Sequence, residues 1–443
     1  NTWGYGAMTN SYNDMMNAKA ALYIGSNAAE AHPVSMLSLL HAKENGCKVI
    51  VVDPRYTRTA AKSDQYIRIR SGTDIPFLFG LLYHIFKNGW EDKKYINDRV
   101  YGMEEIRKEV MEKWTPAAVE EACGVPEAQM YKAAETMAKN RPSTIVWCMG
   151  QTQHTIGNSM VRASCILQLA LGNVGKSGGG TNIFRGHDNV QGATDVGPNP
   201  DSLPGYYGLA AGSWKHYATV WGVDYDWIKG RYAPDMMEKS GTTVSRWVDA
   251  VLEKNDMIDQ QTTVKGLFFW GHAPNSQTRG LDMKRAMDKL DLLVVVDPYP
   301  SATAAMAAMP PAEGQTVNKN RNVYLLPAAT QFETCGSATA SNRSLQWREK
   351  VIDPLFESVP DHVIMQAFAD RLGFGEELSK NYKILNSKFA GKQWKEPQIE
   401  DILREINRSV WTIGYTGQTP ERLKAHMRMV ATFDPRTLKS RGG

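Results

Sequence analysis

A duplicated pattern constrains the fold of this chain more than any other feature. Residues 51–61 read Val-Val-Asp-Pro-x-x-x-x-Thr-Ala-Ala, and residues 295–305 repeat every fixed position. In both copies the pattern begins at the end of an apolar run, and an earlier apolar run ends in a glycine. Two apolar runs joined by a helical segment are typical of a β-α-β unit in a parallel sheet. The sequence therefore predicts a duplicated nucleotide-binding architecture; the alternative is that Asp-Pro is only a turn that ends two strands.

The two copies have similar spacing, which supports one shared architecture. Gly25 precedes Asp53 by 28 residues, and Gly271 precedes Asp297 by 26. The expected strands are 21–24, 48–52, 144–149, 266–270 and 292–296, and the expected helices are 36–42, 74–88, 102–140, 158–171, 281–290 and 361–373. The predicted fold class is α/β, with two pseudo-symmetric Rossmann-like domains whose parallel sheets surround a shared cofactor cleft.

Three regions are predicted along the chain. A first Rossmann-like domain covers 1–184, and a second covers 185–335 with an aromatic-rich insertion at 198–263. A helical tail and linker at 336–443 is expected to lead to a further domain. The chain starts at Asn1 without an initiator Met, so we expect a piece of a longer polypeptide.

The composition argues against several classes of protein. The chain has 51 Lys and Arg against 47 Asp and Glu, which is not the strongly basic balance of a nucleic-acid-binding protein. No apolar run is long enough for direct membrane insertion, and 77–86 is expected to be a buried helix. The five cysteines lie at least 17 residues apart, so no zinc or iron–sulfur site is expected in this segment. Such sparse cysteines are typical of a reducing compartment, and we expect a cytoplasmic protein.

The ends of the predicted strands supply the candidate cofactor-binding residues. Ligands of open parallel sheets bind outside the carboxyl ends of the strands. An Asp at the end of the second strand can accept a hydrogen bond from a ribose or a guanine edge, although it can also form only a turn. The Gly-x-Gly-x-x-Gly fingerprint is missing from both copies, which disfavours an ordinary nicotinamide dehydrogenase. The candidate positions are Gly25, Ser26, Asn27, Asp53, Pro54, Arg55, Gly72, Asp74, Met149, Gly150, Gln153, Gly271 and Asp297.

The segment 170–177 is similar to a phosphate-binding loop. A true phosphate loop lies between a buried strand and a helix, so that backbone amides converge on the phosphate. Here a predicted helix precedes the segment and a run of glycines follows it. We therefore expect no phosphate site at this loop.

The polar segment 185–195 is the candidate catalytic loop. Its composition makes a buried core element unlikely, because glycine loses the most backbone entropy on folding. Arg185 can present a planar pair of donors to a small carboxylate, and His187 can orient a partner or relay a proton. The alternative for Arg185 is a structural salt bridge to Asp188 or Asp195. Of the other histidines, His84 is expected in the core with satisfied hydrogen bonds, whereas His32 and His154 lie beside the predicted binding turns.

Several motifs resemble those of one known family. They are Arg185-Gly-His-x-Asn-Val-Gln-Gly-Ala-x-Asp195, Gly25-Ser-Asn-Ala-Ala-Glu-Ala-His-Pro33, Asp53-Pro-Arg-x-Thr-x-Thr-Ala-Ala61 and the twin Val-Val-Asp-Pro units. The chain is similar, over nearly its whole length, to the molybdopterin oxidoreductases that carry two molybdopterin guanine dinucleotides. Within that family it looks like the catalytic subunit of a molybdenum- or tungsten-dependent formate dehydrogenase.

The resemblance implies a set of cofactors and roles. Each half of the duplicated architecture would bind one dinucleotide, and Arg185 would contact formate beside the molybdenum or tungsten. The metal's Cys or selenocysteine ligand, an iron–sulfur cluster and a C-terminal pterin-binding domain would lie outside this segment. Formate or carbon dioxide and electron-transfer subunits with iron–sulfur clusters, with flavin or NAD, are the implied partners, in an NAD-linked complex.

Two points of the resemblance stay open. After the second copy's first strand the family often has Gly-x-Asn-Pro, whereas this chain has Gly271-His-Ala-Pro274-Asn275. The alternatives for the function are another bis-pterin oxidoreductase such as a nitrate reductase, or a pterin-binding scaffold subunit without turnover.

Overall fold

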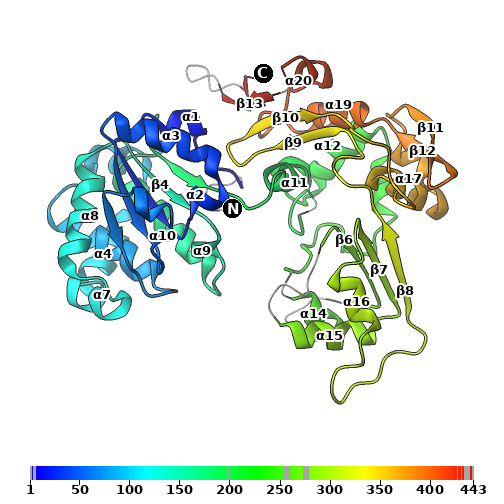
Figure 1. The fold of residues 1–443 in the computed structure, drawn as a ribbon, viewed down its shortest axis with the longest axis horizontal. Helices are drawn as coiled ribbons and strands as arrows, with labels where there is room; N and C mark the ends of the chain where they lie inside the picture. The colour runs from blue at the N-terminus through cyan, green and yellow to red at the C-terminus, as the bar shows by residue number, and fades with distance from the viewer. Residues whose placement is uncertain are drawn as a thin grey trace. The chain divides into compact units, whose positions relative to one another are not determined.

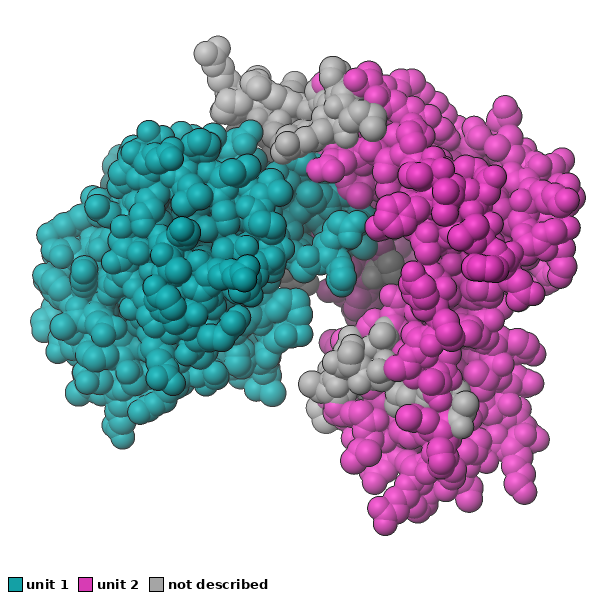
Figure 2. All heavy atoms as spheres, viewed as in Figure 1, with its two compact units in different colours: residues 1–194, 339–344 teal, residues 195–338, 345–443 magenta. Residues whose placement is uncertain are grey.

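The computed structural model divides the chain into two compact units (Figure 2). Unit 1 comprises residues 1–194 and 339–344, and unit 2 comprises 195–338 and 345–443. The chain leaves unit 1 within helix α11 (Val190–Val196). The three-region division predicted from the sequence stays a prediction beside this arrangement. The structure describes residues 2, 6–197, 199–244, 246–253, 260, 262–272, 279–426, 428–430, 432–433 and 440–441.

Unit 1 is built on a five-stranded parallel sheet, which confirms the predicted fold class. The strand order is β3-β2-β1-β4-β5, so the order reverses between β1 and β4. Such a reversal is the point at which ligands bind in open α/β sheets. The strands are β1 (Ala20–Ile24), β2 (Lys48–Val52), β3 (Gln65–Ile67), β4 (Ser143–Trp147) and β5 (Thr181–Ile183).

Alternating apolar side chains of β1 cover both faces of this sheet. Leu22 and Ile24 join a core with α4, α8 and α10, while Ala21 and Tyr23 face a second core with α1 and α3 (Figure 1). Successive residues of a strand point to opposite faces, so an unbroken apolar strand requires helices on both sides. The helices of unit 1 are α1 (Tyr12–Met15), α2 (Ala28–Ala31), α3 (Pro33–Glu44), the 3-10 turn η1 (Ala60–Lys62), α4 (Asp74–Lys87), α5 (Lys93–Arg99), α6 (Met103–Lys113), α7 (Pro116–Cys123), α8 (Glu127–Lys139), α9 (Met149–Thr152) and α10 (Gly157–Ala170).

Two sequence predictions in unit 1 were wrong in detail. The predicted helix over 102–140 is three helices, because Pro116 begins α7 behind the capping side chain of Thr115 and Gly124, at φ +71°, ends it. The predicted strand 144–149 ends at Trp147, and Met149 begins α9 instead.

Unit 2 contains the second copy of the β-α-β pattern. Strands β6 (Gly266–Trp270), β7 (Leu292–Asp297) and β8 (Asn322–Pro327) form a parallel sheet in the order β6-β7-β8. Helices α14 and α15 pack on one face, and α17 packs on the other. The helices of unit 2 are η2 (Pro204–Tyr206), α12 (Ala211–Trp221), α13 (Tyr225–Lys229), α14 (Trp247–Leu252), α15 (Gly280–Lys289), α16 (Ala302–Ala308), α17 (Asp361–Leu372), α18 (Gly375–Leu378), α19 (Ile399–Ser409) and α20 (Pro420–His426).

The sequence predicted a helical tail and linker after residue 336. The structure shows strands in this region as well as helices. This region includes β9 (Gly336–Thr339), β10 (Ser344–Arg348), β11 (Ile384–Phe389), β12 (Lys392–Pro397), β13 (Arg428–Val430), β14 (Thr432–Phe433) and β15 (Ser440–Arg441). β11 and β12 form an antiparallel hairpin that packs on α17. The predicted aromatic-rich insertion forms a core of its own around Trp214 and Tyr217.

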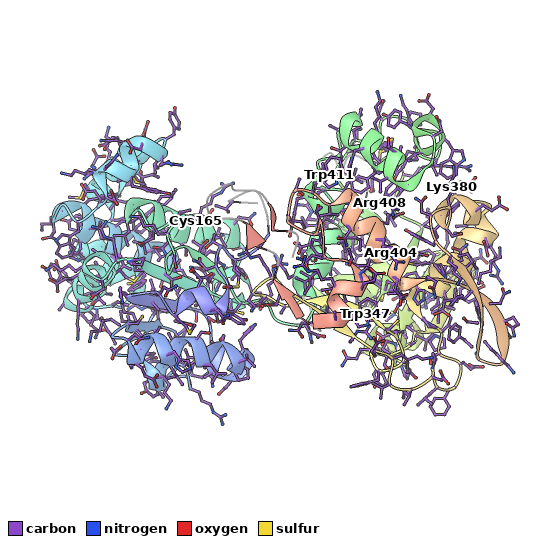
Figure 3. All side chains as sticks on the ribbon, turned by 90° about the horizontal axis from the view of Figure 1, so that it is seen from above. Cys165, Trp347, Lys380, Arg404, Arg408 and Trp411 are labelled. Carbon is purple, nitrogen blue, oxygen red and sulfur yellow. The ribbon has the colours of Figure 1, made fainter. Side chains whose placement is uncertain are left out.

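Three basic side chains of unit 2 are labelled in Figure 3, namely Lys380, Arg404 and Arg408. Two of them have partners within the unit. Arg404 pairs with Glu421 and, at 2.6 Å, with Asp401, and Lys380 donates to the Gly222 carbonyl oxygen. These two cations stabilise the unit, so their presence does not argue for a nucleic-acid surface.

Candidate cofactor and substrate site

Gly25 and Gly150 meet at the point where the strand order of unit 1 reverses. Gly25 follows β1 at φ +60°, and the Gly150 amide donates to its carbonyl oxygen at 3.2 Å. A Cβ on Gly25 would lie 2.6 Å from the Gln151 nitrogen, and a Cβ on Gly150 would lie 2.7 Å from the Gly25 oxygen. Only glycine fits at either position, because no side chain is tolerated so close to backbone atoms. The structure thus brings together two predicted positions from strands that are far apart in the sequence.

Polar atoms beside this junction lack partners, which fits a bound polar ligand. The Ser26 side chain is 2% exposed, and its hydroxyl makes no hydrogen bond to any described residue. The Gln151 Oε1 atom is likewise buried and without a partner among the described residues, although its Nε2 donates to Ser164. A buried polar group without a partner is costly unless a ligand or water satisfies it. These residues fit a pterin dinucleotide, which is rich in donors and acceptors.

One carboxylate oxygen of Asp53 stabilises the predicted turn, and the other is available to a ligand. Asp53 Oδ1 accepts from the Arg55 amide at 2.9 Å, so the residue does shape the turn. Pro54 and Arg55 are exposed beside it. Asn27 Oδ1 accepts from the hydroxyl of the buried Thr59 at 3.0 Å, which ties the first turn to the repeated Thr-Ala-Ala segment. The turn-forming alternative is therefore correct for one oxygen of Asp53, and the other oxygen makes no hydrogen bond to a described residue.

The second copy has the same hydrogen bonds at its glycine and its aspartate, whereas its threonine binds a backbone oxygen instead of a side-chain oxygen. The Gly271 amide donates to the Val296 carbonyl at 2.8 Å, as Gly25 does to Val52 at 3.1 Å. Asp297 Oδ1 accepts from the Tyr299 amide at 2.9 Å. The hydroxyl of the buried Thr303 donates to the His272 carbonyl at 3.4 Å, so the repeated threonine again ties the two turns together. The predicted duplication is confirmed; the departure at Pro274 and Asn275 lies outside the described residues.

The remaining predicted cofactor residues of unit 1 lie in the segments that follow β3 and β4. His154 Nε2 donates to the Gly150 carbonyl oxygen at 3.0 Å, and a Cβ on Gly72 would lie 3.9 Å from the His154 Nδ1 atom. Asp74 begins α4 with a side chain that is 5% exposed, and burial raises the pKa of its carboxyl above the usual range. Met149 and Gln153 are exposed. His154, which the sequence left undecided, therefore connects two of the predicted binding turns.

Arg185 is half-buried and directed into unit 1. Its Nη1 donates to the Val190 carbonyl at 3.3 Å and to the Thr194 hydroxyl, and its Nη2 donates to the Gly6 carbonyl. It makes no ion pair with any described carboxylate, so the predicted alternative of a salt bridge to Asp188 or Asp195 is wrong. Asp195 instead accepts from the Tyr206 and Tyr415 hydroxyls.

The candidate loop is more ordered than the sequence suggested. Only 185–189 is irregular, and α11 follows with Gln191 and Asp195 buried, so the expectation that 185–195 avoids the core is wrong. His187 is exposed in the irregular part, and its side chain contacts no described residue by a hydrogen bond.

A turn that the sequence analysis missed supports this loop. The Arg185 amide donates to Ser341 Oγ at 3.0 Å, and the Thr339 amide donates to Asn189 Oδ1 at 3.0 Å. Both supporting residues come from 339–344, about 150 residues later in the chain. No local signal in the sequence could have placed this turn beside Arg185.

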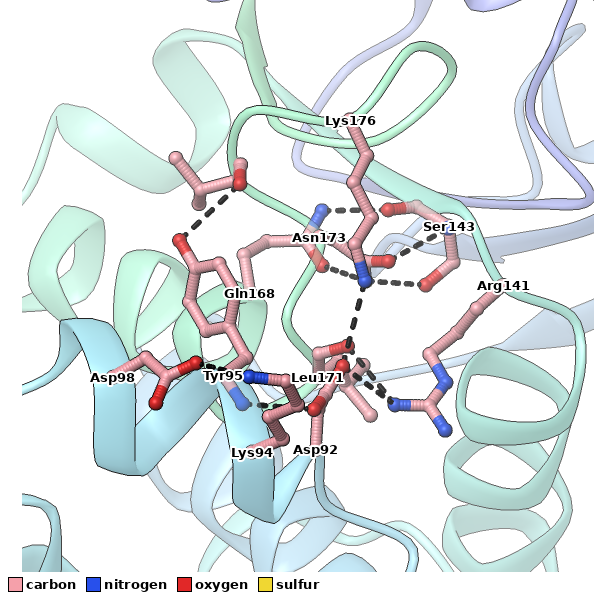
Figure 4. Close-up of polar contacts among 11 residues, drawn as sticks. Asp92, Lys94, Tyr95, Asp98, Arg141, Ser143, Gln168, Leu171, Asn173 and Lys176 are labelled. Carbon is pink, nitrogen blue, oxygen red and sulfur yellow. Dashed lines mark hydrogen bonds and ion pairs between the residues drawn. The ribbon is translucent and has the colours of Figure 1, made fainter.

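Two side chains of the segment similar to a phosphate loop make contacts within unit 1 (Figure 4). Asn173 donates to Ser143 Oγ and to Gln168 Oε1, each at 2.8 Å, and accepts from the Ser143 amide at 3.1 Å. Lys176 reaches Asp92 at 3.4 Å. The side chains that would otherwise face a phosphate bind the protein itself.

The structure also shows how far the predicted core cysteines and His84 are buried. Cys47, Cys123 and Cys165 are buried, and burial raises the pKa of the Cys165 thiol to about 12 (Figure 3). His84 is 2% exposed as expected, but its Nε2 has no partner among the described residues, so the prediction of a satisfied histidine is wrong. In the described part of the chain no group of three His, Cys, Asp or Glu could hold a metal ion.

Two further features of the described residues bear on the site. No helix has the length and the apolar character that crossing a membrane requires. Two cavities of about 410 and 390 Å³ lie in unit 2, lined by residues between 326 and 400. Neither is lined by a predicted site residue, so the strand-end turns and not these cavities are the candidate site.

Comparisons with known proteins identify the family to which this chain belongs. The model of the family described as Molybdopterin oxidoreductase matches residues 3–371. The F420-dependent formate dehydrogenase subunit alpha of Methanocaldococcus jannaschii is 33% identical over 95% of this chain and 55% of its own length. The nitrate-inducible formate dehydrogenase major subunit of Escherichia coli is 30% identical over 92% of this chain and 48% of its own. Among solved structures, acetylene hydratase from Pelobacter acetylenicus has a TM-score of 0.66, with 20% identity, over 97% of this chain and 55% of its own, and shows the fold alone. The chain spans about half the length of these relatives.

Proposed function

Because the chain belongs to the molybdopterin oxidoreductase family, we propose that it forms the central part of the catalytic subunit of a formate dehydrogenase. Two relatives at 33% and 30% identity carry that name. The observation that carries the proposal is the state of Arg185: it has no carboxylate partner among the described residues. Its Nε–H makes no hydrogen bond to a described residue, and Nη2 uses one of its two. A guanidinium can offer two such unused N–H groups to the two oxygens of a carboxylate.

The proposed cofactor is a pair of molybdopterin guanine dinucleotides, one at each copy of the repeated turn. Gly25, Ser26, Asn27 and Asp53 would hold one, and the turns around Gly271 and Asp297 would hold the other. The unpartnered hydroxyl of Ser26 and the unpartnered Oε1 of Gln151 support this assignment. When bound, the cofactor supplies a molybdenum or tungsten centre for two-electron redox chemistry. An iron–sulfur cluster elsewhere in the subunit would take up the electrons, and a cleft shared by the two copies stays a prediction.

The residues of this chain would act mainly by positioning formate. Oxidation breaks the C–H bond of formate and yields carbon dioxide, one proton and two electrons. Arg185 would hold the two carboxylate oxygens so that the C–H bond faces the metal centre, which is a gain in orientation. His187, exposed in the same loop, would orient the substrate or relay the proton. Carbon dioxide is neutral, so it loses the charge-assisted hydrogen bonds to Arg185 and leaves.

The electron acceptor and location belong to the same proposal. The sequence analysis expected electron-transfer subunits of an NAD-linked complex in the cytoplasm. One relative is named for F420 instead, so a reduction assay with the full complex should compare NAD and F420 as acceptors. Cell fractionation tests the location.

Substitution of Arg185 tests the function. In the full-length protein loaded with cofactor, Arg185→Ala should reduce kcat/KM for formate by about a hundredfold or more, because two charge-assisted hydrogen bonds are lost. Arg185→Lys keeps the charge without the planar pair of donors and should be intermediate. Azide should lose inhibitory strength in parallel. Kinetic constants are measured per mole of bound metal, with nitrate as the competing substrate.

Two control variants help to distinguish formate binding by Arg185 from a purely structural role of Arg185 in its loop. Arg99→Ala removes an exposed arginine at the end of α5 and should leave the kinetics unchanged. Asp188→Ala tests the exposed carboxylate of the same loop. An unchanged formate KM in metal-replete Arg185→Ala would overturn the proposal.

A further inference from the structure

His32 stands between two helices with a backbone that is fixed on both sides. It caps the end of α2, where its amide donates to the Ala28 carbonyl at 2.8 Å. It also precedes α3, where its carbonyl accepts from the Ser35 amide at 3.0 Å and from the Ser35 hydroxyl at 2.7 Å. Pro33 at the first position of α3 restricts the chain further. The imidazole therefore projects from a rigid part of unit 1.

Aromatic contacts fix the direction of the imidazole ring. The ring lies against Phe184 with a centroid distance of 5.2 Å. Phe184 is fully buried and makes edge contacts with Tyr12 at 5.2 Å and Tyr23 at 6.2 Å. Because Phe184 immediately precedes Arg185, this packing sets the ring beside the base of the candidate loop.

The hydrogen bonds of the ring determine its tautomer. Nε2 contacts the Arg185 carbonyl oxygen, which can only accept, so Nε2 carries the proton and donates. Nδ1 is buried and has no partner among the described residues. Burial also lowers the pKa of His32. The imidazole is therefore a neutral, one-sided donor to the main chain of Arg185.

We propose that His32 is a positioning residue for Arg185, and that its Nε2–H group fixes the base of the substrate-binding loop. Ser341 Oγ accepts from the Arg185 amide at 3.0 Å. The backbone N–H and the carbonyl oxygen of Arg185 are therefore both hydrogen-bonded. Beyond it, residues 186–189 are exposed. His32 is thus a link between the first cofactor-binding turn, Gly25 to Asn27, and the guanidinium that would bind formate. This inference rests on the proposed function of Arg185.

A matched set of variants tests this role in the full-length protein loaded with cofactor. His32→Phe keeps the ring contact with Phe184 and removes the donor. His32→Gln places a donor near the position of Nε2, whereas His32→Asn is too short to reach it. His41→Phe, on the exposed side of α3, is the control. The measurements are KM and kcat for formate per mole of bound metal, and hydrogen exchange of the amides of 185–190.

The expected result is a split between the kinetic constants. His32→Phe should raise the formate KM by about tenfold, the effect of one lost hydrogen bond, with kcat changed by less than about threefold. Exchange at 185–190 should quicken in the same variant. His32→Gln should restore both readouts, and His32→Asn and His41→Phe should match the Phe variant and the parent protein, respectively.

The failures of the two proposals are distinguishable. If Arg185→Ala keeps a normal formate KM, the proposed function fails, and the exchange data alone report whether His32 holds the loop. If Arg185→Ala raises KM but His32→Phe changes neither KM nor exchange, the role of His32 is overturned. Loss of cofactor in both His32→Phe and His32→Gln would also overturn it, because His32 would then serve cofactor retention.

Discussion

The two copies of the β-α-β turn share the hydrogen bonds of the strand-ending glycine and of the aspartate, but they have different surroundings. In unit 1, β1 lies between β2 and β4, and all its residues are buried. In unit 2, β6 pairs only with β7 among the described strands, and Gly266 and Phe268 are exposed. Gly25 abuts the backbone of Gly150, whereas a Cβ on Gly271 would meet no described atom within 4 Å.

This difference distinguishes the features that are specified by the repeated sequence itself from the contacts that depend on neighbouring strands. The strand-ending glycine, the Asp turn and the buried threonine recur because each is specified within one β-α-β unit. The close contact of Gly25 with Gly150 and the burial of β1 depend on β4. The described part of unit 2 has no strand that corresponds to β4. We therefore expect the same ligand chemistry at the two turns and a different tolerance to substitution.

The largest expected effect comes from replacing the two glycines. Gly25→Ala combines strain at φ +60° with a Cβ 2.6 Å from a backbone nitrogen, and should cost about 3–5 kcal/mol. Gly271→Ala, at φ +57°, carries only the strain and should cost about 1–2 kcal/mol. Hydrogen-exchange protection of β1 and β6, respectively, reports each loss within its own unit. Equal losses would show that the contact with Gly150 contributes nothing.

Intermediate effects are expected at the two aspartates, where the copies should behave alike. Asp53→Ala and Asp297→Ala should each lower the retention of pterin dinucleotide during purification, by about 1.5–3 kcal/mol of binding free energy. Asp53→Asn and Asp297→Asn keep the oxygen that accepts from the Arg55 and Tyr299 amides, respectively. Cofactor loss in the Ala variants but not in the Asn variants would identify both residues as turn formers only. A loss confined to one copy would break the symmetry of the proposed sites.

The sequence predicted the local features of this site because they are encoded locally. β2 begins and ends at the predicted residues, since the four apolar positions between Lys48 and Asp53 favour one short buried strand. The Asp53 and Asp297 turns follow from the repeat in the same way. The closeness of Gly25 and Gly150 needed only one further rule, that adjacent parallel strands place their carboxyl ends together.

The rest of the site depends on long-range packing that no local pattern encodes. The support of Arg185 by Ser341 joins residues 156 positions apart. Helix α11 was missed because its glycine and polar residues disfavour a helix, while the hydrogen bonds of the buried Gln191 and Asp195 side chains in the folded protein offset that propensity. His84 was expected to be satisfied because most buried polar groups are, and its unpartnered Nε2 is visible only in the structure.

The smallest expected effect is a difference in the response of the two units to acid. Burial lowers the pKa of His84 below the usual 6.5, against the opposing influence of nearby Glu127, while Lys87 lowers it further. In unit 2, burial raises the pKa of Glu405 above the usual 4.5, and the carboxyl contacts the Tyr382 hydroxyl at 2.6 Å. One buried group therefore resists protonation in the folded state, and the other favours it.

The signs of the two contributions follow from linkage. Below pH 6.5 the unfolded chain binds a proton at residue 84 that the folded unit 1 resists, so unit 1 loses stability as the pH falls. The contribution of Glu405 is fully present below pH 4.5 and is lost as the pH rises through its folded pKa, so acid favours unit 2. His84→Phe keeps the edge contacts with Tyr83 and Tyr131 and should flatten the pH dependence of unit 1 below pH 6.5. Glu405→Gln should flatten that of unit 2. Protection factors of α4 and α19 amides measure the two responses separately, and an unchanged slope for α4 in His84→Phe would show that His84 does not set the acid sensitivity of its unit.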